Sequence, residues 1–163
     1  NGIQEIRWIG SRTLTRAELL GAPHLRPVLI RKGALGDGLP ERDMVVSPQH
    51  RVLVAGRAPQ LYFAESEVLV AAKHLVGRPG IEALESLRAT YVHFLFDRHE
   101  VVLSDGSWTE SFQPGDMTLG AMGEAQRGEI VELFPELADH VGRRGYAAAR
   151  RALKGHEARL LQF

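Results

Sequence analysis

The sequence predicts a mainly β fold, a compact all-β domain closed upon itself, with a C-terminal α-helical appendage. Two observations predict it. Between residues 3 and 112, short apolar segments alternate with Gly, Pro and Asp at the spacing of short strands joined by turns. Long parallel strands would need helices between them, so a closed β arrangement is favoured. After residue 115 the composition changes to helical patterns, which predicts a β domain over 1–115 and a helical extension over 116–163.

The individual elements follow from local signals, taken in chain order. One helical turn is expected over 13–20, with Thr15 as its N-cap, because a Thr hydroxyl can accept from backbone N–H groups of the first turn. The glycines within 33–38 permit positive φ and predict a turn. Ser104-Asp105-Gly106 predicts a tight hairpin. Strands are expected at residues 3–9, 27–31, 43–47, 50–55, 60–63, 67–70 (followed by a helical turn through Val76), 89–97 and 99–104.

The extension is expected to form two helices. From Glu124 to Leu161 apolar residues recur at helical spacing, and residues 146–161 are rich in Ala, Arg and Leu, which favour helix. Gly142 and Gly145 separate the two segments. Apolar helix faces need cover, so the tail should pack on itself, on the β domain or across a dimer. The apolar positions include Leu133, Phe134, Leu137, Ala148, Ala152 and Leu160.

Composition and charge exclude several classes of protein. The 163 residues suit one domain, or one domain with an appendage. Twenty basic residues balance twenty acidic ones, so no net field attracts nucleic acid or an anionic membrane surface. No apolar run approaches the roughly 20 residues of a membrane span. Because the chain has no Cys, disulfides and thiolate metal sites are excluded. An opening Asn1-Gly2 without an initiator Met is expected of a processed or subcloned fragment.

The motif Ser47-Pro48-Gln49-His50 lies between two apolar runs, 44–46 and 52–54. A hydroxyl three residues ahead of an imidazole, at a break between two strands, lets both groups converge on one point. There they could act on a peptide bond under attack, with the imidazole as general acid. The competing interpretation is an ordinary turn with a structural histidine.

A second polar cluster lies in the segment 91–106. If 91–99 is a strand, Val92, Phe94 and Phe96 share one face. His93, Asp97 and His99 then share the other face with Leu95. Titratable groups beside an apolar face indicate a polar site backed by a core, although a half-buried strand with a solvated face has the same pattern.

These two segments, in this order, resemble the later motifs of the Hint family, the self-cleaving domains of hedgehog proteins and inteins, and most closely its bacterial branch. The resemblance implies a horseshoe-shaped Hint-like fold over roughly residues 3–115. It also implies a bacterial protein, and is compatible with secretion as part of a larger one. Further similar segments, in the right order, are Ile6-Arg7-Trp8-Ile9-Gly10, Leu25-Arg26-Pro27-Val28 and Glu110-Ser111-Phe112.

The resemblance also implies roles for individual residues. In the family a nucleophile attacks the carbonyl just before it and converts an amide to a thioester or ester. Ser47 would then hold the scissile peptide, and His50 would protonate the leaving nitrogen. His93 or Asp97, with His99 on the same face, would assist acyl transfer. The partner would be the chain's own upstream segment, with no cofactor, and the oligomeric state stays open.

Two departures from the family limit this expectation. The first block, with its Cys or Ser nucleophile, would precede Asn1, and Ser11 lies too late to replace it. Residues 1–163 alone are therefore expected to be inert. Asn1 is also the only asparagine, so the asparagine cyclisation that completes splicing has no residue to perform it. Hedgehog-type processing, in which only the upstream bond is cut, is expected instead of splicing.

Two functions from other classes compete with self-processing. His50, His93, Asp97 and His99 could form a two-histidine, one-carboxylate metal site in a β-barrel enzyme. The chain could also be a non-catalytic interaction module that docks through its tail. The tail's basic residues are interspersed with Glu136, Asp139 and Glu157, so a solvated amphipathic helix is favoured over nucleic-acid binding.

Overall fold

The computed structural model of the chain describes residues 2–96, 98–111, 132 and 149–161. Within these residues the fold is mainly β, as the sequence predicts, and no helix is long and apolar enough to cross a membrane. The strands are β1 (Trp8–Thr15), β2 (Val28–Ile30), β3 (Met44–Val46), β4 (Arg51–Ala55), β5 (Glu67–Ala71), β6 (Ile81–Ala83), β7 (Arg88–Leu95), β8 (Val101–Ser104) and β9 (Ser107–Glu110). The helices are α1 (Arg16–Gly21), α2 (Arg57–Phe63) and α4 (Gly155–Ala158), with 3-10 turns η1 (Pro23–Leu25) and η2 (Ala72–His74).

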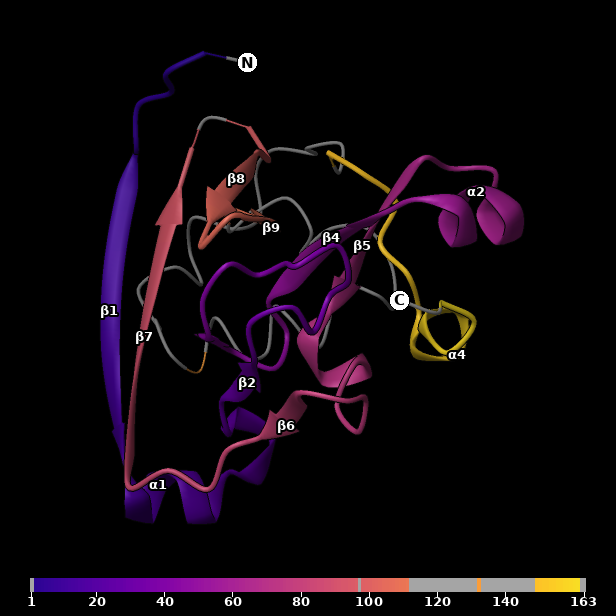
Figure 1. Cartoon of the computed structure of the whole chain (residues 1–163). Coiled ribbons are helices and arrows are strands. Elements are labelled where there is room, and N and C mark those ends of the chain that lie inside the picture. The colour runs from indigo at the N-terminus through magenta and orange to yellow at the C-terminus, as the bar shows by residue number, and fades with distance from the viewer. Residues whose placement is uncertain (1, 97, 112–131, 133–148, 162–163) are drawn as a thin grey trace.

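The strands pair into three antiparallel sheets. β1 and β7 form a long ribbon along one side of the molecule, and α2 and α4 lie on the other side (Figure 1). The second sheet has the order β3-β2-β6, and the third has the order β5-β4-β9-β8. In the third sheet β9, the last of these strands along the chain, lies between β4 and β8. This insertion of β9 builds the candidate site described below.

The hydrophobic core joins the three-stranded and four-stranded sheets. Residues two apart on one strand point to the same face, which explains why pairs such as Val28 and Ile30 of β2 are buried together. The end of the chain contributes three residues to the same core. The cluster consists of Val28, Ile30, Met44, Val52, Val54, Val68, Val70, Ala72, Leu75, Ile81, Leu153, Ala158 and Leu161.

Two local predictions are confirmed in detail. Thr15 caps α1: its hydroxyl accepts from Glu18 N at 3.4 Å, and the Glu18 carboxylate accepts from Thr15 N at 2.8 Å, which completes a capping box. The β8–β9 hairpin turns at Asp105 and Gly106, whose φ angles are 49° and 77°. Two consecutive positive φ values are the geometry that an Asp-Gly turn favours.

Two predicted strands are corrected by the structure. Residues 60–63 lie in α2, because Gly56 begins the helix with φ of 119° and Pro59 fits the first turn, where no intrahelical donor is needed. The first strand starts at Trp8 and runs through Thr15, not over 3–9. Its extent is set by pairing with all eight residues of β7, a long-range partner that local sequence does not reveal.

The described end of the tail is also different from the prediction. A helix is expected over 146–161, but among its described residues, 149–161, only α4 is α-helical, and Ala152 forms a β-bridge with Leu69. Leu69 N donates to Arg151 O and Leu153 N donates to Leu69 O, both at 2.8 Å, so the tail covers the free edge of β5. These bonds to β5 compete with helix formation. The other predicted helix and the Gly142–Gly145 break lie outside the described residues, apart from Glu132.

We expect hydrogen exchange to show that this docking persists in solution. The amides of Leu69 and Leu153 should be strongly protected, because both are paired and both residues are buried. The amide of Lys73, which is paired in a turn at the exposed surface, serves for comparison. Unprotected amides at 151–161 together with a protected β4–β5 pair would contradict the docking.

Candidate functional site

The segment between β3 and β4, which carries the Ser47 and His50 side chains, is a tight turn. His50 N donates to Ser47 O at 3.1 Å. The turn is also tied to the end of β5, because Ala72 N donates to His50 O and Lys73 N donates to Pro48 O, both at 2.9 Å. The predicted hydroxyl and imidazole therefore belong to one rigid turn that is anchored on two sides.

The Ser47 hydroxyl is buried without a partner. Ser47 is 4% exposed, and its Oγ makes no hydrogen bond to any described part of the chain. A buried hydroxyl without a partner lowers stability by about 1–3 kcal/mol. Its hydrogen-bonding capacity is free for a group that enters the site.

Beside this turn lies a buried ion pair between Arg51 and Glu110. Arg51 Nη1 donates to Glu110 Oε2 at 3.0 Å, and Arg51 N donates to Glu110 Oε1 at 3.1 Å. Both side chains are less than a tenth exposed. The sheet register explains the contact: Val52 of β4 pairs with Thr109 of β9, which brings the next residues, Arg51 and Glu110, face to face. The antiparallel order therefore places a carboxylate next to His50.

His99 reaches the same carboxylate from the other side of β9. Val101 of β8 pairs with Glu110, and Glu100 N bonds the Ser111 hydroxyl at 3.0 Å, so the chain before β8 passes close to Glu110. His99 Nε2 lies 3.2 Å from Glu110 Oε2, and its side chain is completely buried. Its Nδ1 accepts from Ala149 N at 3.1 Å. This assigns the proton to Nε2, which faces the carboxylate.

His93 comes to the site on the β1–β7 ribbon. It is partly buried and pairs across the ribbon with Gly10, while its neighbour Val92 is exposed. The pKa of His93 is lowered to about 4, chiefly by burial and also by positive charge on His50, while Glu110 opposes the change. His50 is thus close enough to affect the charge of His93, although His93 lies on the β1–β7 ribbon and His50 in the turn between β3 and β4.

Burial also controls the charge state of the other groups. It lowers the pKa of His50, with Glu110 opposing and Arg51 adding to the effect. Burial alone would raise the pKa of Glu110, but the contact with His99 and the charges of Arg51, His99 and His50 together hold it below its ordinary value. At neutral pH the site therefore holds one carboxylate, one guanidinium, and neutral His50 and His93.

The structure brings four of the five sequence-predicted site residues into this region. Ser47 and His50 share the turn, His93 interacts electrostatically with His50 and Glu110, and His99 contacts Glu110. Asp97 lies outside the described residues. The predicted common strand face is wrong for His99, because β7 ends at Leu95 and His99 lies in the connection before β8.

Sequence reasoning missed Arg51 and Glu110 as members of the site. Glu110 was identified only within a segment similar to the family, and Arg51 was not singled out at all. The sequence held no local signal for Glu110, because β9 buries the adjacent residues Thr109 and Glu110 together, whereas strand alternation would place only one of them inside. Which cation it would meet depends on the β4–β9 register.

This arrangement of buried groups can move a proton. A neutral imidazole accepts a proton from an attacking hydroxyl or thiol and delivers it to a leaving nitrogen. A nearby buried carboxylate stabilises the transient imidazolium. A free hydroxyl on the same turn can hold the substrate peptide.

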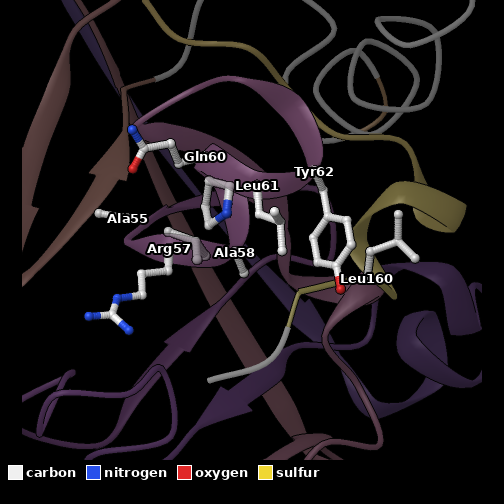
Figure 2. Close-up of a pocket in the computed structure, with 9 residues that line it drawn as sticks. Ala55, Arg57, Ala58, Gln60, Leu61, Tyr62 and Leu160 are labelled. Atoms are coloured by element: carbon white, nitrogen blue, oxygen red, sulfur yellow. The ribbon is translucent and has the colours of Figure 1, made fainter.

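Two other features do not coincide with this site. Within the described residues, no group of three His, Asp or Glu side chains is placed to hold a metal ion. An open pocket of about 730 Å³ lies between α2 and Leu160, with Leu61 and Tyr62 exposed at its wall (Figure 2). None of the predicted site residues lines it.

The depressed pKa of His93 makes a prediction about stability. Between pH 6.5 and about 4 the unfolded chain binds a proton on this imidazole that the folded chain does not, so stability falls as the pH is lowered through this window. The loss should be about 1–3 kcal/mol. Urea denaturation at pH 7 and 4.5 should show a smaller loss for His93→Gln than for the unchanged chain. The exposed His156→Gln is the control, and an unaltered pH dependence in His93→Gln would contradict the assignment.

Comparison with known proteins identifies the family of the chain. The sequence model of the Hint domain family matches residues 1–116. Searches of curated proteins and of solved structures each found no match. The matched residues include the turn of Ser47 and His50, the strand of His93, and both His99 and Glu110. They cover more than half of the 163 residues, and the chain therefore belongs to the Hint domain family of self-processing domains.

Proposed function

We propose that this domain cleaves the peptide bond upstream of it by an N-to-S or N-to-O acyl shift, and does not splice. The observation that carries the proposal is the buried Ser47 hydroxyl, which has no hydrogen-bond partner among the described residues and lies on the same anchored turn as His50. A hydrogen-bonding group left unsatisfied by the fold is suited to a group that arrives with the substrate.

The proposed step rearranges one peptide bond without net gain or loss of protons. A thiol or hydroxyl attacks the preceding carbonyl carbon, the new C–S or C–O bond forms, and the C–N bond breaks. The proton leaves the nucleophile and ends on the released nitrogen. Water or another nucleophile then takes the acyl group.

His50 carries that proton in the proposed step. Because its pKa is lowered by burial, the imidazole is neutral at neutral pH and can accept the proton before it donates it to nitrogen. Ser47 donates a hydrogen bond to the scissile peptide. His93, also neutral, lies beside His50 and supports proton movement in the second stage.

The proposal includes no downstream cleavage. Splicing releases its downstream flank by cyclisation of an asparagine, and residues 2–163 contain none. Residues 1–163 include no Cys, and Ser11 lies too late to replace the nucleophile of the first block. A polypeptide of residues 1–163 is therefore expected to be stable against self-cleavage.

The proposal can be tested with an extended protein. Residues 1–163 would be preceded by a first block from another Hint domain, beginning with Cys, and by a short reporter. Gel electrophoresis and mass spectrometry should show release of the reporter at the bond before that Cys, faster with hydroxylamine or a small thiol. Changing that Cys to Ala should abolish release. No cleavage by the folded extended protein, or cleavage prevented by a chelator, would contradict the proposal.

Ser47→Ala in the extended protein should separate function from stability. Cleavage should slow by about fivefold, the effect of one hydrogen bond of ~1 kcal/mol. The midpoint of denaturation should be unchanged or higher, because an unpaired buried hydroxyl is removed. Ser107→Ala is the matched control: Ser107 is equally buried and unpaired in the described structure, but follows the β8–β9 turn. Equal slowing in both variants would contradict the role of Ser47.

A further inference from the structure

Glu110 is a buried carboxylate whose part in the proposed reaction has not been assigned. It is 2% exposed and ends β9. Its Oε1 accepts from the backbone of Arg51, and its Oε2 accepts from the Arg51 guanidinium and lies 3.2 Å from His99 Nε2. Taking a charge out of water is unfavourable even when it is paired, and a well-packed apolar pair is often as stable. Fold stability alone is therefore a weak reason for this arrangement.

The backbone contact gives Glu110 a direct influence on His50. Arg51 N belongs to the peptide group that also contains His50 O. Glu110 accepts from the N–H of this group at 3.1 Å, and Ala72 N donates to its C=O at 2.9 Å. Both ends of the peptide after His50 are thus fixed, from β9 on one side and from η2 on the other. These two hydrogen bonds fix the orientation of the peptide group, and therefore the direction in which the His50 side chain points.

Glu110 also supplies negative charge to the histidines. The charges that act on His50 are those of Glu110 and, more weakly, Arg51. His93 is affected by His50 and Glu110, and His99 lies against the carboxylate itself. When His50 accepts a proton, a cation forms in a buried region next to the Arg51 guanidinium. A fixed anion nearby stabilises that cation more than it would in water.

We propose that Glu110 is a positioning residue of the self-processing site, which rests on the function proposed above. Its carboxylate fixes the peptide that follows His50 and compensates the positive charge that forms on His50 as the proton passes from nucleophile to leaving nitrogen. Arg51 on β4 and His99 in the connection before β8 hold the carboxylate in place.

The test measures the pH dependence of cleavage in the extended protein. Glu110→Gln should lower the maximal rate by about tenfold or more, and the acid limb of the rate profile should move to lower pH, because the neutral amide no longer favours protonated His50. Glu110→Asp keeps the charge and should retain the acid limb at a reduced rate. Glu82→Gln, which removes a surface carboxylate on β6, should change neither. A Glu110→Gln profile with an unmoved acid limb overturns the inference.

A second variant and a second measurement keep the test decisive. If Glu110→Gln fails to fold, the double variant Arg51→Met/Glu110→Gln takes its place. It removes both buried charges, so no cation is left buried without a partner. Its acid limb should still move to lower pH, because Glu110 acts on His50 more strongly than Arg51 does. In residues 1–163, NMR titration of the His50 imidazole should show the same shift without any cleavage. Failure of the unchanged extended protein to cleave would refute the proposed function; an unshifted His50 titration would refute the role of Glu110.

Discussion

Replacing His50 by alanine in the extended protein is expected to slow cleavage by about 10²-fold or more, the usual effect of losing a general acid–base group. The imidazole is the group on the anchored turn that can carry the proton to the leaving nitrogen. The methyl group of alanine can neither accept nor donate that proton. Single-turnover release of the reporter, followed by electrophoresis, gives the rate constants directly.

The His50 result needs a test of specificity. His156→Ala changes an exposed histidine in α4 and should leave the rate unchanged. Far-ultraviolet circular dichroism should show that His50→Ala retains its strands, since only a partly exposed side chain is shortened. Cleavage at full speed with His50 replaced would mean that another group moves the proton.

Arg51→Met is expected to lower the free energy of unfolding of residues 1–163 by about 3–5 kcal/mol, because it leaves the buried Glu110 carboxylate without its cation. Met resembles the stem of Arg in length and apolar character, so little of the loss should come from a cavity. Urea denaturation at pH 7 measures the difference. The double variant Arg51→Met/Glu110→Gln should recover much of the loss, because neither charge remains buried.

A surface pair provides the matched control. Arg31 Nη2 lies 2.7 Å from Glu82 Oε1, a shorter contact than the buried pair, but both side chains are half exposed. Arg31→Met should therefore change stability by less than about 1 kcal/mol. If Arg51→Met and Arg31→Met had equal effects, the buried pair would not hold β4 and β9 together as its geometry indicates.

Local sequence predicted the parts of this fold that local forces create. The Thr15 cap and the Asp105-Gly106 hairpin depend on a few neighbouring residues, and both are formed as expected. The apolar runs that became β3, β4 and β5 were also found within a residue or two. Residues 60–63 were wrong, because a short apolar run fits a helix and a strand equally well.

The tail shows where local propensity loses to tertiary contacts. Residues 149–153 have a helix-forming composition, yet they are not helical, and residues 151–153 pair with β5, since the free edge of that strand offers backbone partners. The same segment brings Ala149 N to His99 Nδ1. A composition-based prediction contains neither contact, because both partners lie far away in sequence.

By itself the sequence determined the chemical groups of the candidate site and the turn that joins two of them. Ser47 and His50 are three residues apart, so one tight turn suffices to place them together. Their relation to His93, His99 and Glu110 was decided only by the tertiary structure. The insertion of β9 between β4 and β8 puts one carboxylate between Arg51 and His99. Burial in the folded chain then lowers the pKa of both His50 and His93, a property that no isolated segment has.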